Sequence, residues 1–223
     1  MPKDKRKKKR YRSKVPRPMN TITCRLSAVY DLKSGDAAAG QLAFVNATLY
    51  TRSLKEAYRP LSTGTPDYRP VNNYDKFYSL FDLYKVRKVH VKYVPTYQME
   101  LYDETGKQEV LPPLVISHDV DNLIQFDVKG QLGDAQTKMR DPSRPWKLSF
   151  SIPQPSGATV DVWQNAQSDD NGFFRSGIIS INSTALMKPN AQVGTLYVTY
   201  DVSFKERQDT NIETILDNTH GNE

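Results

Sequence analysis

The sequence is poor in the residues that crosslink a fold or ligate metals. It holds one cysteine, Cys24, and three histidines in 223 residues. A single thiol excludes an internal disulfide framework and any zinc site that needs two or more cysteines. No apolar run reaches the roughly 18 residues of a transmembrane helix, and no apolar stretch follows the charged N-terminus as in a secretory signal. We therefore expect a soluble chain made in a reducing compartment.

Catalytic motifs are also missing. The sequence contains no glycine-rich nucleotide loop, Walker A, G-x-S-x-G or H-E-x-x-H pattern. Cys24 alternates with apolar residues, which predicts a buried structural thiol rather than a nucleophile. His90 lies between two valines in a strand-like segment, which is typical of a solvated or hydrogen-bonded side chain. We expect neither an enzyme nor a cofactor.

One polar cluster has oxygen ligands at a useful spacing. His118, Asp119 and Asp121 follow an apolar run, and carboxylates suit calcium. Two carboxylates do not fill the six to eight positions of that ion, and a turn after a strand explains the residues equally well. Residues 169–172 (DDNG) are typical of a turn rather than a catalytic carboxylate pair, and we expect no metal site. Trp146 and Trp163 are expected to be core or interface anchors.

Charge is distributed unevenly along the chain. Residues 1–18 hold ten of the 31 basic residues and one of the 25 acidic ones, so this arm carries +9 and the rest of the chain −3. A block of like charge without apolar periodicity is expected to stay disordered. Such an arm suits a phosphate backbone, and a tyrosine within it can stack on an unpaired base. The predicted nucleic-acid-binding residues are Lys3, Lys5, Arg6, Lys7, Lys8, Lys9, Arg10, Tyr11, Arg12, Lys14 and Arg17. The same residues also match a nuclear localisation signal, and a merely solubilising tail is the plain alternative.

The rest of the chain is dominated by strand signals. Apolar and polar residues alternate with period two in 21–30, 146–152 and 196–204. Residues 83–94 alternate too, but with a change of phase that predicts a bulge or a strong bend. Shorter apolar runs predict further strands at 42–49, 113–117 and 177–182, and weaker ones at 123–128 and 158–163. Two segments, 52–58 and 75–81, are expected to form short helices.

These elements predict an all-β fold. Strands separated by long polar connections, at 51–75, 96–112, 129–145 and 164–172, indicate an antiparallel sandwich or barrel. A single eight-stranded antiparallel jelly roll with long loops fits better than an immunoglobulin domain, which needs only about 100 residues. We expect a disordered basic arm at 1–20, the jelly roll at 21–206 and a polar C-terminal tail at 207–223.

Three segments carry a resemblance to a known family. Residues 80–95 (LFDLYKVRKVHVKYVP), 151–155 (SIPQP) and 194–204 (GTLYVTYDVSF) resemble strand regions of capsid proteins of circovirus-like viruses, which have small circular single-stranded DNA genomes. The arm is shorter and richer in lysine than the arginine-dominated arms typical of circoviruses. Residues 93–96 (YVPT) and the 194–198 run also resemble tombusvirus-like shell domains of RNA viruses. Many of those carry a protruding domain, for which this chain has no room.

The resemblance implies a structural function. A capsid protein of this kind self-assembles into a T=1 icosahedral shell of about 60 subunits, and its basic arm packages single-stranded DNA. It implies a virion location, passage through the host cell nucleus by the import machinery, a host receptor for attachment, and no membrane partner. The −3 of the remaining chain is expected to keep the shell exterior from binding nucleic acid indiscriminately. The alternatives are a tombusvirus-like RNA virus coat protein and a cellular nucleic-acid-binding protein with a basic tail; a jelly-roll enzyme or sugar-binding module lacks a clear site.

Overall fold

A computed structural model describes residues 21–36, 41–60, 67–96, 111–120, 137–153, 163–165 and 177–207. Within these ranges the chain forms ten strands and one short helix, α1 (Tyr74–Tyr78). The strands are β1 (Ile22–Lys33), β2 (Asn46–Tyr50), β3 (Tyr58–Pro60), β4 (Phe81–Pro95), β5 (Leu114–Asp119), β6 (Lys138–Arg140), β7 (Trp146–Ser151), β8 (Gln164–Asn165), β9 (Ile178–Ser183) and β10 (Gln192–Arg207). The arm, the end of the predicted tail from residue 208, and the weak strand predicted at 123–128 lie outside the described residues, as does most of 158–163.

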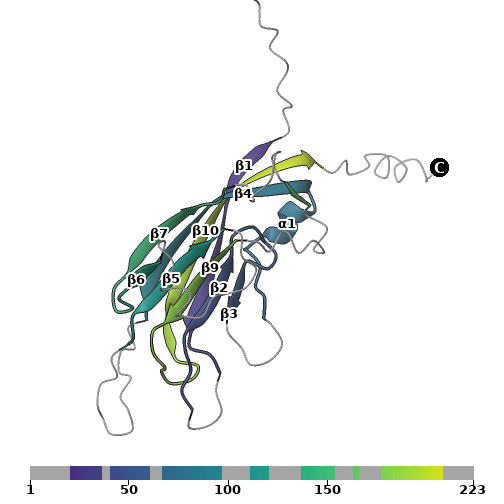
Figure 1. Cartoon of the computed structure of the whole chain (residues 1–223). Helices are drawn as coiled ribbons and strands as arrows, with labels where there is room; N and C mark the ends of the chain where they lie inside the picture. The colour runs from purple at the N-terminus through teal and green to yellow at the C-terminus, as the bar shows by residue number, and fades with distance from the viewer. Residues whose placement is uncertain are drawn as a thin grey trace, which may run out of the picture.

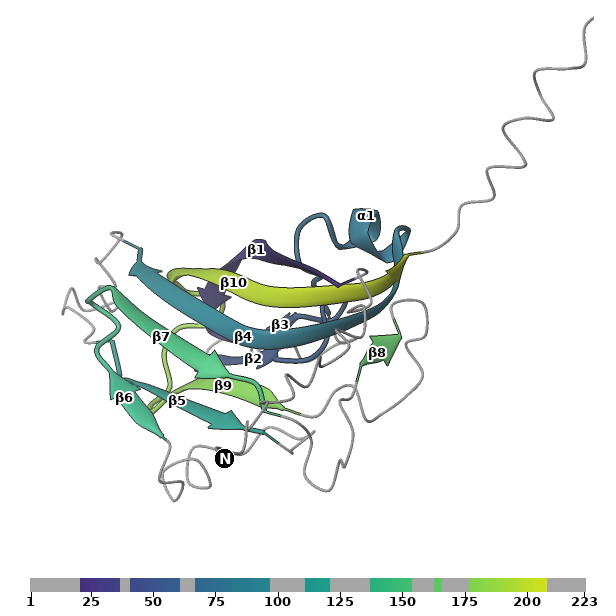
Figure 2. The same cartoon turned by 90° about the horizontal axis from the view of Figure 1, so that it is seen from above.

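The strands form two antiparallel sheets that face each other (Figure 1, Figure 2). The first sheet has the order β1-β10-β4-β7, with β8 paired to β4, and the second has the order β3-β2-β9-β5-β6. The chain passes repeatedly from one sheet to the other, so neighbours in space are distant in sequence. Two interleaved four-stranded sheets are the jelly-roll arrangement. The predicted eight-stranded all-β jelly roll is confirmed, with β3 and β8 as short additions.

The first sheet is built around its longest strand. β10 has 16 residues and pairs with β1 on one side and with β4 on the other. Leu26, Tyr200, Val89 and Phe150 stand opposite one another across the four strands, and all four are buried in the core. Because side chains alternate along a strand, this register sends every second residue of each strand into the sandwich.

The bulge predicted in residues 83–94 is present in β4. Lys88 pairs with Asp201, but Val86 pairs with the next residue, Val202, so Arg87 is an extra residue in the ladder. The insertion lets Val86 and Val89 both face the core although their positions differ in parity. The phase change in the sequence is therefore the signature of the bulge.

The central strand of the second sheet is buried on both faces. All six residues of β9 are buried, and only Ile179 and Ile181 of its apolar residues belong to the main core cluster. Ser180 and Asn182, which point the opposite way, are 2% exposed each. In the described part of the chain, exposed strand residues are therefore concentrated on the first sheet, and those of the second sheet lie on its short edge strand β6.

Buried tyrosines connect the sheets with the loops. The rings of Tyr30 and Tyr58 stack with centroids 4.4 Å apart. The Tyr30 hydroxyl donates to the Pro70 carbonyl at 3.1 Å, and the Tyr58 hydroxyl donates to the Asp31 carbonyl at 2.8 Å. Each ring is thus packed on its apolar faces while its hydroxyl keeps a partner, as buried tyrosines require.

Gly194 creates room for a third buried tyrosine. A Cβ built on Gly194 would overlap the ring of Tyr93 and lie 2.6 Å from the Val94 carbonyl oxygen. Tyr93 is fully buried and stacks on Trp146, with ring centroids 5.1 Å apart. Its hydroxyl lies 2.7 Å from the Pro142 carbonyl and 2.9 Å from the Val193 carbonyl. A glycine at this point of β10 lets the tyrosine ring lie against the strand backbone.

Two local predictions were wrong, namely the helix at 52–58 and the absence of a strand from the connection at 129–145. Residues 52–58 form a turn instead of a helix, because Tyr58 enters β3 opposite Leu49 and the Glu56 amide donates to Ser53 Oγ. The second predicted helix is present as α1 but ends at Tyr78, since Phe81 begins β4. β6 lies in a segment expected to be a loop; its sequence, KMR, lacks the alternation that marks a strand. No helix of the described chain has the length and apolar character to cross a bilayer.

Candidate nucleic-acid interface

Alternate residues of the first sheet point away from the core and form one continuous surface. We call this surface the polar face. It consists of Thr23, Arg25, Ser27, Val29 and Asp31 on β1, Thr195, Tyr197, Thr199, Asp201 and Ser203 on β10, Lys85, Arg87, Lys88, His90 and Lys92 on β4, and Lys147, Ser149 and Ser151 on β7. The strand register arranges these residues in rows that cross the strands.

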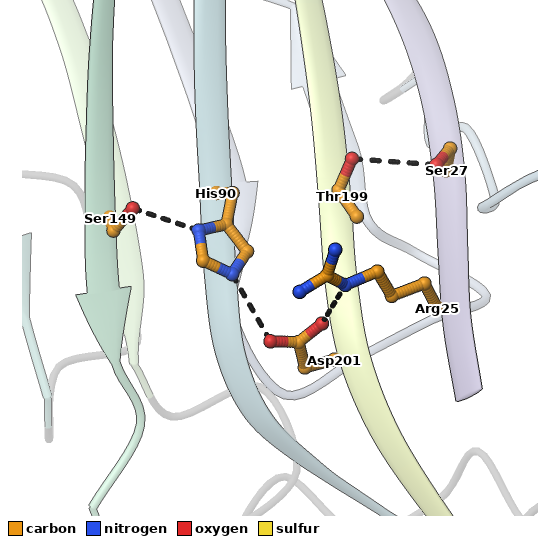
Figure 3. A network of polar contacts seen from close by, with 6 residues as sticks. All are labelled: Arg25, Ser27, His90, Ser149, Thr199 and Asp201. Carbon is orange, nitrogen blue, oxygen red and sulfur yellow. Dashed lines mark hydrogen bonds and ion pairs between the residues drawn. The ribbon is translucent and has the colours of Figure 1, made fainter. Parts of the chain in front are cut away.

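A hydrogen-bonded network occupies the middle of the polar face (Figure 3). Arg25 Nε donates to Asp201 Oδ1 at 2.8 Å, and His90 Nε2 lies 3.1 Å from Asp201 Oδ2. His90 Nδ1 lies 2.8 Å from Ser149 Oγ, so the network joins all four strands. This confirms the expectation that His90 is a hydrogen-bonded strand residue. Cross-strand pairs of this kind fix the register of a sheet.

Asp201 is the negative centre of the network. Burial alone would raise the pKa of its carboxyl group, but hydrogen bonds from Arg25 and His90 and the charge of Arg25 outweigh burial and lower it. The carboxylate is therefore ionised at neutral pH. It compensates Arg25, whose side chain is 72% exposed.

The bulge adds cations beside this network. Arg87 Nε donates to Ser203 Oγ, and the Arg87 side chain is exposed. A shallow hollow at this point is lined by Thr23, Cys24, Arg25, Arg87, Lys88 and Asp201. Three of these six side chains are cationic and one is anionic, so the hollow is suited to an anion more than to a cation.

The polar face as a whole is basic. Its ionised residues are the cations Arg25, Lys85, Arg87, Lys88, Lys92 and Lys147 and the anions Asp31 and Asp201, an excess of four positive charges. This excess is not evident from the net charge of −3 beyond residue 18, because that sum also includes the acidic residues of the loops. The signal was present in the sequence: Lys92 and Lys147 occupy polar positions of alternating strands. Exposed cations on an ordered surface are what a polyanion contacts.

The other residues considered from sequence have structural surroundings. Trp146 is 8% exposed and belongs to the core, as expected. Cys24 is half-buried rather than fully buried; burial raises the pKa of its thiol, which disfavours the reactive thiolate. His118 is buried at the end of β5, with its ring 5.2 Å from that of Phe150. Lys205 lies 5.0 Å from the Trp163 ring, so this tryptophan lies on the surface side of the first sheet.

Several predicted residues cannot be placed. All the nucleic-acid-binding residues predicted in the arm lie within 1–20, outside the described residues, and so do Asp121 and residues 169–172. Among the residues that the structure describes, no group of three or more histidine, cysteine, aspartate or glutamate side chains could hold a metal ion.

Comparison with solved structures places the fold among viral capsid shells. Tobacco necrosis virus matches 85% of this chain and 84% of its own, with a TM-score of 0.56 and 9% identity. A virus-like particle of the nodavirus of the giant freshwater prawn Macrobrachium rosenbergii matches 86% and 97%, with a TM-score of 0.54 and 14% identity. A T=1 subviral particle of a Penaeus vannamei nodavirus capsid deletion mutant matches 83% and 98%, with a TM-score of 0.51 and 15% identity.

Sequence comparison adds no family. A scan against known protein families and a search of curated proteins both find no match. The structural matches support a viral capsid fold, and the matched viruses are RNA viruses. The circovirus-like, single-stranded DNA identity suggested by three short segments gains no support from these matches. Short strand motifs are shared by many jelly rolls because the alternation of apolar inward and polar outward residues restricts the residue types at each position.

Proposed function

We propose that this chain is the shell-forming coat protein of a small icosahedral virus of the tombus-like type and that it packages single-stranded RNA. The observation that carries the proposal is the match along almost the whole jelly roll to isolated capsid shells, up to 98% of the matched chain. A likeness of fold alone does not establish function. Here it is joined by a basic arm, a basic sheet face and the lack of a catalytic constellation in the described residues.

Self-association is supported by an exposed apolar patch at one end of the sandwich. Ala43 and Met187 exchange backbone hydrogen bonds at 2.8 and 2.9 Å and point inward. Their neighbours Leu42, Phe44 and Leu186 are 50%, 41% and 46% exposed. Apolar side chains gathered in this way are usually covered in an assembly. A second copy of the chain is the occupant that a closed shell supplies.

The basic arm is proposed to neutralise the packaged strand. About 60 arms of +9 would bring about 540 positive charges inside a shell. Binding by such arms depends on salt and not on base sequence, because lysine and arginine displace condensed counterions. Nuclear passage and a host receptor are not needed for this proposal.

Electron microscopy of the purified full-length protein tests the proposal. The expected result is uniform closed particles that protect RNA from nuclease. A variant with the ten basic residues of 1–18 replaced by glutamine should still form shells but lose the nucleic acid. A Phe44→Asp variant should remain soluble as subunits, whereas Tyr78→Asp, an equally exposed site on α1, serves as the matched control. Only monomers or small oligomers under all salt and pH conditions would favour the cellular nucleic-acid-binding alternative.

The nature of the cargo is tested by competition. Single-stranded RNA and DNA of one sequence and length are offered together during assembly from disassembled subunits. Preferential protection of RNA supports the proposal. Preferential protection of DNA would restore the circovirus-like alternative.

A further inference from the structure

An aromatic ring lies exposed among lysines on the polar face. Tyr197 of β10 is 44% exposed, and Lys92 Nζ lies 5.4 Å from its ring centroid. The register puts Val29, Tyr197, Lys92 and Lys147 side by side in one row across β1, β10, β4 and β7. Val29 is itself 54% exposed. The row therefore offers an open apolar and aromatic strip bordered by two exposed ammonium groups.

The lysines of this row are available to a ligand. Within the described part of the chain, Lys92 and Lys147 form no ion pair. Of the two carboxylates of the polar face, Asp201 is engaged by Arg25 and His90, and Asp31 accepts from Gln192 Nε2 at 3.4 Å. Lys92 rests on the Tyr197 ring instead. A cation–π contact at an exposed site is weaker than the stacking of a nucleobase on the same ring, so a base can displace the ammonium group.

The cations continue toward the start of β1. Arg25 and Lys88 lie two rows away, about 13 Å from the Tyr197 row at 3.3 Å per residue, and the bulge residue Arg87 lies next to Lys88. The arm joins the sheet at Ile22, seven residues before Val29 and hence about 23 Å from the same row. A strand of nucleic acid held by the arm would thus meet one cationic row, cross the row of Ser27, Thr199, His90 and Ser149, and reach the lysines beside Tyr197.

The combination fits a single strand better than a duplex. In a duplex the bases stack on one another and the phosphates face outward, so no base would be free to stack on the exposed Tyr197 ring. An unpaired base offers a π-face that can stack on Tyr197 while its flanking phosphates meet the lysines. Stacking on any base explains why this site needs no hydrogen-bonding groups for base recognition.

We propose that Tyr197, Lys92 and Lys147 form a single-stranded nucleic-acid site on the ordered jelly roll, separate from the basic arm. Tyr197 stacks an unpaired base, and the two lysines hold the adjacent phosphates. The inference rests on the proposed function in that it takes the packaged nucleic acid as the ligand. It adds that the sheet itself, and not the arm alone, contacts the strand.

Binding of the full-length protein to a fluorescent single-stranded oligouridine of about 30 nucleotides tests this site. Tyr197→Ala should weaken binding roughly 5- to 150-fold, which is the range for loss of one stacked base, whereas Tyr197→Phe should stay within about twofold of the parent. Lys92→Gln with Lys147→Gln should lower the magnitude of the slope of log K against log salt by about 1.4. The control for these lysine substitutions is Lys138→Gln on β6, an exposed residue of the other sheet. It removes a charge that lies outside the polar face, so Tyr197→Ala should weaken binding by the same factor with or without it. Ultraviolet crosslinking should attach the strand to the peptide that contains Tyr197.

The outcomes separate this site from the proposed function. If the parent packages RNA but Tyr197→Ala binds and crosslinks like the parent, the site is wrong and the coat-protein proposal stands. If Tyr197→Phe loses as much affinity as Tyr197→Ala, stacking is refuted as the contact. If the site binds oligouridine as expected but no condition yields shells, the coat-protein proposal fails and the site stands. Because Tyr197 is exposed, its substitution should leave the urea unfolding midpoint unchanged. An unchanged midpoint excludes unfolding as the cause of weaker binding.

Discussion

Replacing Gly194 by alanine should lower the free energy of unfolding by about 2–4 kcal/mol. The new methyl group would meet the buried ring of Tyr93 and the backbone carbonyl of Val94, and neither can move freely. Tyr93 is held by its stacking on Trp146 and by its hydroxyl contacts with Pro142 and Val193. The backbone is held by the pairing of Gly194 with Pro95.

The magnitude follows from two contributions. An extra methyl group in a packed interior costs about 1–3 kcal/mol through displaced side chains and backbone. If the Tyr93 ring shifts to make room, its hydroxyl loses hydrogen bonds worth about 1 kcal/mol net. The sum of the two contributions is the expected loss of about 2–4 kcal/mol, which is large for the addition of one methyl group.

Urea unfolding of the unassembled subunit, followed by tryptophan fluorescence, measures the effect. Trp146 reports directly because its ring stacks on Tyr93. With a slope of about 2 kcal/mol per molar urea, the midpoint should fall by about 1–2 M. The same substitution in a Tyr93→Leu background should cost less than in the parent, because the obstructing ring is gone and only the close approach to the Val94 carbonyl remains. An equal cost in both backgrounds, or almost none in the parent, would refute the steric argument.

Two further predictions concern ionisation. Burial raises the pKa of Tyr30, Tyr58 and Tyr93, so their protonated forms are favoured in the native state. The contribution of these three tyrosines to stability should therefore be constant below about pH 9 and be lost above about pH 10. Tyrosinate absorbance should then rise together with loss of the circular dichroism signal, and ionisation of these three tyrosines ahead of unfolding would contradict the argument. Asp201→Asn should cost at most about 1 kcal/mol at neutral pH, since Arg25 is largely exposed. The lowered pKa of Asp201 means that this contribution is lost only as the pH falls below about 4, so stability curves of parent and variant should converge in acid, and a constant offset would exclude the ion pair as its source.

The sequence was informative where one face of a strand meets the core. The alternation in β1, β7 and β10 predicted these strands, and the phase change in β4 predicted the bulge at Arg87. Ile22 shows the limit of that signal: it has the parity of the core residues, yet it is 53% exposed because it lies at the end of the sheet. Alternation predicts which side a residue faces, but not where the opposing sheet stops.

The candidate site was harder to predict. The basic arm was evident from its charge, but the polar face was not, because its cations come from strands that are far apart in the sequence. Lys92 and Lys147 become neighbours only when β4 pairs with β7, and Tyr197 joins them through β10. The order of strands in a sheet, which single-sequence patterns do not provide, decides which charges add up.

The alternation of the first sheet also separates two kinds of selective pressure. Inward residues such as Leu26, Val89 and Tyr200 determine whether the sandwich forms, whereas the residues between them can change charge with little effect on packing. Substitutions at the outward positions can therefore change the surface charge of the sheet without changing the core that holds the fold together.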